Sequence, residues 1–192
     1  MNRLKEILLN DNWLFHKENE VEGCVTLPHT YNAVDGQSGI SMWRGKGFYK
    51  KEVLFSEEDL KEKIFLEIGA SAMKSTVYMN GKTICHNTCP YAMYRIALNE
   101  HIIVGKNLLE IVTDNTATDE VYPQMADFSF YGGVYRDVKL VFVPQQLHFD
   151  YLDGSRDGVQ EVGWTKVGSY SNRLCDQRRK RLRRGSESIC FR

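Results

Sequence analysis

Short runs in which apolar and polar residues alternate follow one another along most of the chain, and none keeps the 3.6-residue period of a long helix. The clearest runs are residues 47–55, 63–68, 75–79, 107–113 and 134–143. Gly, Asn, Asp and Ser stand between them, and these residues favour turns. The pattern predicts about eight to ten short strands and no long helix.

Three local signals refine this prediction. Asn80-Gly81 separates two alternating runs, which is the strongest short sequence signal for a β-hairpin. Residues 56–59 predict a turn or the first turn of a short helix. Leu4, Ile7 and Leu8 would share one face of a helix, so residues 1–10 predict a short helix.

Strands at this spacing predict an all-β antiparallel sandwich or barrel, because alternating strand and helix units are missing from the pattern. We expect this domain to cover residues 1–150, which is long enough to bury a core of its own. Residues 145–150 can still form one strand.

The character of the sequence changes at residues 151–192. Residues 1–144 hold 15 Lys and Arg against 19 Asp and Glu, a balance of −4, whereas residues 145–192 hold 10 against 6, a balance of +4. No apolar period survives in this tail, which predicts disorder, and it ends in the basic run 178–184. We expect a truncated or frame-shifted gene product, with a natural linker and a functional basic tail as the alternatives.

Composition excludes several classes of function. No apolar run approaches the ~20 residues of a membrane helix. Residues 1–6 carry no secretory signal, so we expect a cytoplasmic protein. The five cysteines include Cys85 and Cys89, but no second pair stands at metal-ligand spacing, so we expect free thiols and no metal or cofactor. The basic run lacks interleaved aromatic residues, which argues against a nucleic-acid partner.

Six separated segments resemble signatures of the N-terminal sugar-binding domain of glycoside hydrolase family 2, and they occur in the family's order. The most specific is Gly133-Val134-Tyr135-Arg136-Asp137-Val138, which resembles the closing strand of that domain. The others are Asn12-Trp13 with Phe15, residues 27–35 with Tyr31 where the family usually has Trp, residues 43–51, residues 66–82, and residues 107–115.

This resemblance implies a galactose-binding-like jelly roll that belongs to a β-galactosidase, β-glucuronidase or β-mannosidase. Such enzymes are retaining exo-glycosidases whose two catalytic Glu residues lie on a later (β/α)₈ barrel, separated from the first domain by an immunoglobulin-like domain. The chain is too short to hold that barrel. We therefore assign no catalytic residue to it and expect no turnover by the chain alone.

The resemblance also implies which residues face substrate. Asp127 stands ten residues before Asp137, where some β-galactosidases of the family have an Asp that binds a sugar hydroxyl. Trp43 and Arg44 can stack on and hydrogen-bond a sugar, although an exposed strand-edge pair would look the same. His29 and Asn32 are expected to shape a loop. Gly132-Gly133 is expected to need positive φ.

The function predicted is that of a sugar-binding domain without its catalytic domains, which binds a β-glycoside only as part of the intact enzyme. Its partners would be carbohydrate and those missing domains, with no membrane contact. The alternative is a non-catalytic carbohydrate-binding module that carries a basic interaction tail.

Overall fold

The computed structural model describes residues 5–35, 41–121, 129–150 and 158–161 of the 192-residue chain. The chain divides into two compact units, Met1–Val143 and Pro144–Arg192. Strands dominate the described residues, and no helix among them is long and apolar enough to span a membrane.

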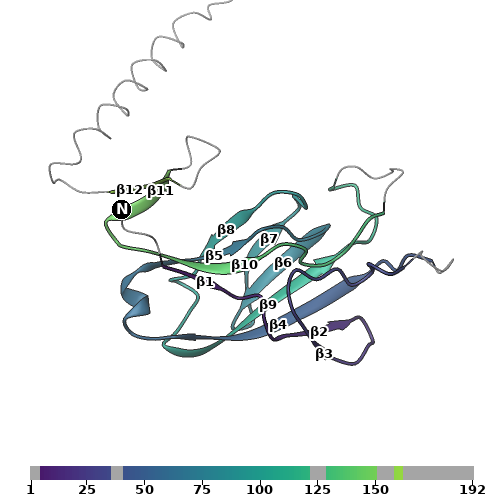
Figure 1. The fold of residues 1–192 in the computed structure, drawn as a ribbon, viewed down its shortest axis with the longest axis horizontal. Coiled ribbons are helices and arrows are strands. Elements are labelled where there is room, and N and C mark those ends of the chain that lie inside the picture. The colour runs from purple at the N-terminus through teal and green to yellow at the C-terminus, as the bar shows by residue number, and fades with distance from the viewer. Residues whose placement is uncertain (1–4, 36–40, 122–128, 151–157, 162–192) are drawn as a thin grey trace, which may run out of the picture. The chain divides into compact units, whose positions relative to one another are not determined.

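Two antiparallel sheets make up the first unit (Figure 1). The four-stranded sheet has the order β1 (Lys5–Leu8), β10 (Val138–Val143), β5 (Lys63–Ile68) and β8 (Tyr94–Ala97). The six-stranded sheet has the order β3 (Gly23–Val25), β2 (Trp13–Lys17), β4 (Lys46–Phe55), β9 (Gly105–Asp114), β6 (Lys74–Met79) and β7 (Lys82–Asn87). The prediction of an all-β antiparallel sandwich is confirmed.

The longest strand pair shows why the sequence alternates. β4 and β9 are paired from Lys46↔Asp114 to Phe55↔Gly105, so one register holds over ten residues of each strand. Successive side chains of a strand point to opposite faces. Tyr49 and Ile111 are therefore buried, whereas Lys50 and Glu110 lie on the other face.

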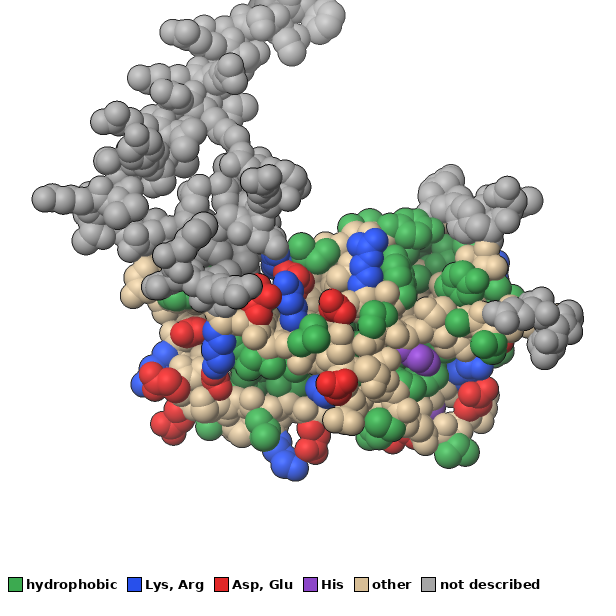
Figure 2. All heavy atoms as spheres, viewed as in Figure 1, with side chains coloured by type: hydrophobic (Ala, Val, Ile, Leu, Met, Phe, Trp, Pro, Cys, Tyr) green, Lys and Arg blue, Asp and Glu red, His purple; other side chains and the backbone are tan. Residues whose placement is uncertain are grey.

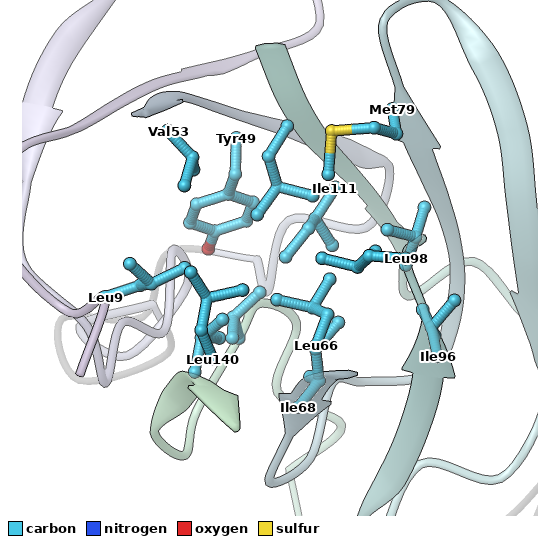
Figure 3. Packing of buried hydrophobic residues seen from close by; sticks show 14 of the residues in the cluster. Leu9, Tyr49, Val53, Leu66, Ile68, Met79, Ile96, Leu98, Ile111 and Leu140 are labelled. Carbon is cyan, nitrogen blue, oxygen red and sulfur yellow. The ribbon is translucent and has the colours of Figure 1, made fainter. Parts of the chain in front are cut away.

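The core fills the space between the sheets (Figure 3). Tyr49, Ile111 and Met79 of the six-stranded sheet point toward Leu66 and Leu140 of the four-stranded sheet. All five are buried. Each such side chain contributes about 1.5–3 kcal/mol through the apolar surface that it removes from water.

Both local turn predictions are confirmed. Asn80 and Gly81 join β6 to β7 with φ values of 53° and 76°, as a type I′ hairpin turn requires. Residues after Ser56 form the short 3-10 helix η1 (Asp59–Lys61). The Ser56 N–H and hydroxyl both donate to Asp59 Oδ2, at 2.9 and 2.7 Å.

The helix predicted over residues 1–10 is wrong. Residues Lys5–Leu8 form β1, which pairs with β10 at the edge of the four-stranded sheet. Its side chains are all exposed, and Leu8 retains 60% of its accessible surface. The extended conformation of Lys5–Leu8 is therefore set by backbone hydrogen bonds to the otherwise unpaired edge of β10, and not by burial of an apolar face.

The second unit contains one described hairpin, in which β11 (Leu147–Asp150) pairs with β12 (Gly158–Glu161). β11 matches the strand expected over residues 145–150. β12 was not predicted, because the sequence after residue 150 lacks a clear alternation. The rest of the predicted disordered tail, including the run Arg178–Arg184, lies outside the described residues.

Candidate functional site

Three connecting segments meet at one end of the first unit: residues 28–35, 43–45 and 130–134. We call this region the loop end. Backbone hydrogen bonds join the segments, since the His29 N–H donates to Val134 O at 2.8 Å and the Tyr31 N–H to Gly132 O at 3.2 Å. Segments far apart in the sequence thus form one continuous surface.

Asn32 lies at the centre of the loop end and is completely buried. Its Nδ2 donates to Trp43 O at 3.3 Å and Phe130 O at 3.2 Å, and its Oδ1 accepts from the Gly132 N–H at 2.9 Å. One side chain therefore satisfies backbone groups of two other segments. This agrees with the loop-shaping role predicted for Asn32.

Asn115 follows the last residue of β9 and binds the same two carbonyl groups as Asn32. Its Oδ1 accepts from the Gly45 N–H at 2.8 Å, and its Nδ2 donates to Trp43 O and Phe130 O, at 3.3 and 3.1 Å. We did not predict this role. The only sequence signal is an Asn directly after a strand, which is also common in exposed turns.

The glycine pair before β10 fits closely against aromatic side chains. Gly133 has φ 124°, as predicted, and a Cβ there would also strike His29 O. Gly132 does not have positive φ, so that part of the prediction is wrong. Glycine is needed there because the phenol of Tyr31 lies against its Cα and leaves no room for a Cβ.

His29 links the loop end to the core. Its Nδ1 lies 2.9 Å from Tyr49 Oη, and its ring packs edge-on to Phe15 at 4.7 Å. Burial, helped by the nearby charge of Lys17, lowers the pKa of His29 below its ordinary value. Burial also raises the pKa of Tyr31 and of Tyr49 well above that of a free phenol. These groups are therefore neutral at pH 7.

Two of the predicted sugar-facing residues lie at the loop end. Trp43 is half-buried, with its ring edge-on to Tyr31 at 5.3 Å and Lys17 Nζ 5.2 Å from its centre. Arg44 is exposed and its guanidinium lies 4.8 Å from the centre of the Phe130 ring. The third predicted residue, Asp127, lies outside the described residues.

A second, smaller apolar cluster supports Phe130. It consists of Ala72, Met73, Val121 and Phe130, with Tyr135 packed against it. The Tyr135 hydroxyl donates to Pro90 O, which ties the connection between β9 and β10 to the connection between β7 and β8. An isolated antiparallel bridge between Ala72 and Gly133 adds a further tie.

The described carboxylates at this end serve structure. Asp35 Oδ2 accepts from the Trp43 N–H at 2.9 Å, and Asp137 Oδ1 accepts from Asn10 Nδ2 at 2.8 Å. Asp114 Oδ1 accepts from the N–H and hydroxyl of Thr116. Among the residues that the structure describes, no three His, Cys, Asp or Glu side chains gather in a way that could hold a metal ion.

The sheet topology and the loop end place the first unit among the jelly-roll β-sandwiches, a class that includes lectin domains. The sequence profile described as "Glycosyl hydrolases family 2, sugar binding domain" matches residues 4–144. The chain belongs to this family, as its sequence signatures predicted.

The chain is similar to β-glucuronidases. It is 33% identical over 165 residues to a β-glucuronidase of Bacteroides fragilis, an alignment that covers 82% of this chain and 24% of the relative. It superposes on the crystal structure of a β-glucuronidase from Bacteroides uniformis with a TM-score of 0.72 and 27% identity, covering 81% of this chain and 20% of that one. The chain thus spans about a fifth to a quarter of the length of these relatives.

Proposed function

We propose that the first unit forms one wall of the substrate pocket in a glycosidase of the β-glucuronidase type. The observation that carries this proposal is the loop end, where Asn32 and Asn115 lock three segments into a single surface that presents Trp43 and Arg44. Binding groups held by buried hydrogen bonds lose little freedom when a ligand arrives. Asp127 belongs to the same wall in this proposal.

The chain alone should not hydrolyse glycosides. Retaining hydrolysis needs two carboxylates about 5 Å apart across the scissile bond, one with a raised pKa. The carboxylates described at the loop end are held by backbone or amide donors instead. Purified chain should show no release of chromophore from aryl β-glucuronides or β-galactosides above buffer background. Reproducible turnover that vanishes in Asp127→Ala would overturn this proposal.

A chimaera tests the role of the wall. Residues 4–144 would replace the matching segment of the Bacteroides fragilis β-glucuronidase, and Trp43→Ala, Arg44→Met and Asp127→Ala would be compared with the parent chimaera. We expect each variant to raise KM for an aryl β-glucuronide. Lys82→Met in the β6–β7 hairpin is the control, because it removes a cation far along the sheet from the loop end. Variants as active as the parent would remove their residues from the site.

The domain boundary and the location also remain proposals. Residues 1–150 would resist limited trypsin digestion, whereas the run Arg178–Arg184 would be cut first, leaving a core of about 150 residues. Cleavage within the sandwich before the run would place the boundary elsewhere. A cytoplasmic location would be tested by fractionating cells that express the chain.

A further inference from the structure

His29 and Tyr49 form a hydrogen-bonded pair at the loop end, and their surroundings fix which atom donates. His29 Nδ1 lies 2.9 Å from Tyr49 Oη, and Tyr49 is completely buried. Among the residues that the structure describes, Nδ1 is the one acceptor within hydrogen-bond distance of the Tyr49 hydroxyl. The hydroxyl therefore donates to an unprotonated Nδ1, and the ring proton of neutral His29 is on Nε2.

The same pair lies against a backbone contact between two segments of the loop end. The His29 N–H donates to Val134 O at 2.8 Å. A Cβ on Gly133 would come within 2.8 Å of Tyr49 Oη, so the phenol reaches the Cα of this glycine. The side-chain bond between His29 and Tyr49 and the backbone bond between His29 and Val134 thus form one contact, which we call the His29 latch.

The chain on either side of the latch is held by groups that do not titrate. Before it, the Leu27 N–H donates to Asn10 O at 2.8 Å. After it, the buried Asn32 Oδ1 accepts from the Gly132 N–H at 2.9 Å. Backbone and amide groups keep these bonds at any pH at which the domain is folded. Opening of the latch is therefore confined to residues 28–31.

A proton on Nδ1 of His29 is incompatible with the closed latch. A protonated Nδ1 is a donor, so it cannot accept from the Tyr49 hydroxyl. That hydroxyl has no other described acceptor, and a buried donor without an acceptor destabilises the arrangement that buries it. Protonation therefore favours separation of the two side chains.

No described group compensates for a positive charge on His29. Lys17 of β2 acts on it with a positive charge of its own, and this field adds to burial in lowering the pKa of His29. Tyr49 of β4 and Tyr31 of the same loop remain neutral phenols, since burial raises the pKa of both. Residues 132–134 offer only backbone groups. On the face drawn in Figure 2, by contrast, acidic and basic side chains are interspersed.

We infer that the His29 latch is a pH-sensitive closure of the loop end, in which residues 28–31 separate from residues 132–134 when the imidazole takes up a proton. The direction follows from linkage, because the open segment leaves the imidazole in water, where it binds a proton more readily. The preference for the closed latch is complete above about pH 6.5 and is lost progressively as pH falls below it. This inference does not depend on which ligand the loop end binds.

The first test is the tautomer of His29, read from long-range ¹H–¹⁵N nuclear magnetic resonance spectra of the 192-residue chain at about pH 7.5. We expect its ring proton on Nε2. His16 is the matched control, because its Nδ1 lies 2.9 Å from Lys17 O. A carbonyl can only accept, so the ring proton of neutral His16 should be on Nδ1. A proton on Nδ1 of neutral His29 would overturn the inference.

The second test is hydrogen exchange of the same chain between about pH 7.5 and about pH 5.5, expressed as protection relative to an unstructured peptide at each pH. Protection of the His29 and Tyr31 amides, which donate to residues 132–134, should fall about fivefold. The Gly133 amide donates to Ala72 O instead and should keep its protection. An equal loss at Gly133 would show unfolding of the whole unit, and unchanged protection at His29 and Tyr31 would show no switch. Either result would overturn the inference.

Variants assign the pH dependence to residues. His29→Asn removes the titrating ring but keeps an acceptor, because Asn Oδ1 is as many bonds from the backbone as His Nδ1, so protection of the Tyr31 amide should be the same at both pH values. Lys17→Met removes the nearby cation, so the closed latch should tolerate the proton better and the fall in protection should become smaller. His16→Asn is the control and should behave as the parent. A fall in His29→Asn as large as that in the parent would overturn the inference.

Discussion

Asparagine side chains close the connections at both ends of the sandwich, but their partners lie at very different distances along the sequence. At the loop end, Asn32 binds backbone atoms of Phe130 and Gly132, which are 98 and 100 residues away. At the opposite end of β9, Asn107 binds backbone atoms of Ile103 and Gly105, which are 4 and 2 residues away, and its Oδ1 also accepts from Asn80 Nδ2, 27 residues away. We call this second region, residues 80–81 and 99–107, the hairpin end.

The two ends therefore differ in how much of the chain must be folded before their hydrogen bonds can form. The turn around Asn107 can form as soon as a few neighbouring residues meet, so it pays a small loop-closure entropy. The loop end can form only after β4, β9 and β10 are in register, because its hydrogen bonds join their ends. The candidate sugar wall therefore joins segments about 100 residues apart, whereas the hairpin end joins its two segments across fewer than 30 residues.

The largest expected loss of stability comes from replacing Asn32 or Asn107 with Ala. Asn32→Ala should lower the free energy of unfolding by about 3 kcal/mol, because it leaves the buried Gly132 N–H without an acceptor. Asn107→Ala should cost about 1–2 kcal/mol, since water can reach the exposed turn at Ile103. Urea denaturation measures both.

Hydrogen exchange would sharpen the comparison. Asn32→Ala should speed exchange at residues 43–45 and 130–134 together, whereas Asn107→Ala should affect only the hairpin end. If Asn32→Ala increased the rate of amide exchange only within residues 28–35, the long-range role assigned to this side chain would be wrong.

Two glycines allow the next comparison. Gly132→Ala should destabilise by about 2–3 kcal/mol, because its methyl group would overlap the phenol of Tyr31. Gly81→Ala should cost about 1 kcal/mol, because its site is open and only the positive φ of 76° opposes a side chain.

The loss of stability should be relieved in a different way at each of these two positions. Tyr31→Leu combined with Gly132→Ala should recover part of the loss by making room, whereas Gly81→Asn should be nearly neutral because Asn tolerates positive φ. A Gly132→Ala variant as stable as the parent would show that Tyr31 moves aside without cost.

A smaller effect is expected from pH at the loop end. The pKa of His29 is lowered in the folded state, so the unfolded chain takes up its proton first as pH falls. The contribution of neutral His29 to stability is present above about pH 6.5 and is lost as pH falls through the folded pKa. His29→Gln should flatten this part of the curve of unfolding free energy against pH. An unchanged slope would contradict the burial assigned to this ring.

The smallest effect belongs to the 3-10 helix η1. Hydrogen bonds from Lys5 Nζ and from Ser56 lower the pKa of Asp59 to about 2. The stabilisation that ionised Asp59 adds to the folded state is present above about pH 3.8 and is lost as pH falls through about 2. Asp59→Asn at pH 7 should cost at most about 1 kcal/mol, because the Lys5 side chain is half exposed and solvent screens its charge. A double-mutant cycle with Lys5→Met would isolate the share of that pair.

Local signals in the sequence account for much of the fold. Alternation predicted most of the strands because a half-buried sheet requires it, and Asn80-Gly81 predicted the hairpin because a type I′ turn requires positive φ at both positions. Trp43 and Arg44 could be named as candidates from their place in a family signature, and the structure locates both at the loop end.

Other features followed from no local pattern. Residues Lys5–Leu8 fit a helix by spacing, yet they pair with β10 because that strand offers an edge of unpaired backbone groups. Asn115 looks like an ordinary turn residue, and its importance comes from Gly45 and Phe130, which lie 70 and 15 residues away.

By itself, the sequence determined most of the strands, the Asn80-Gly81 and Ser56 turns and the family of this chain, because each depends on residues that stand close together or in a fixed order. Only the tertiary structure decided which backbone groups Asn32 and Asn115 satisfy and why Gly132 can carry no side chain. These properties depend on contacts between distant segments, and such contacts exist only once both sheets have packed around their core.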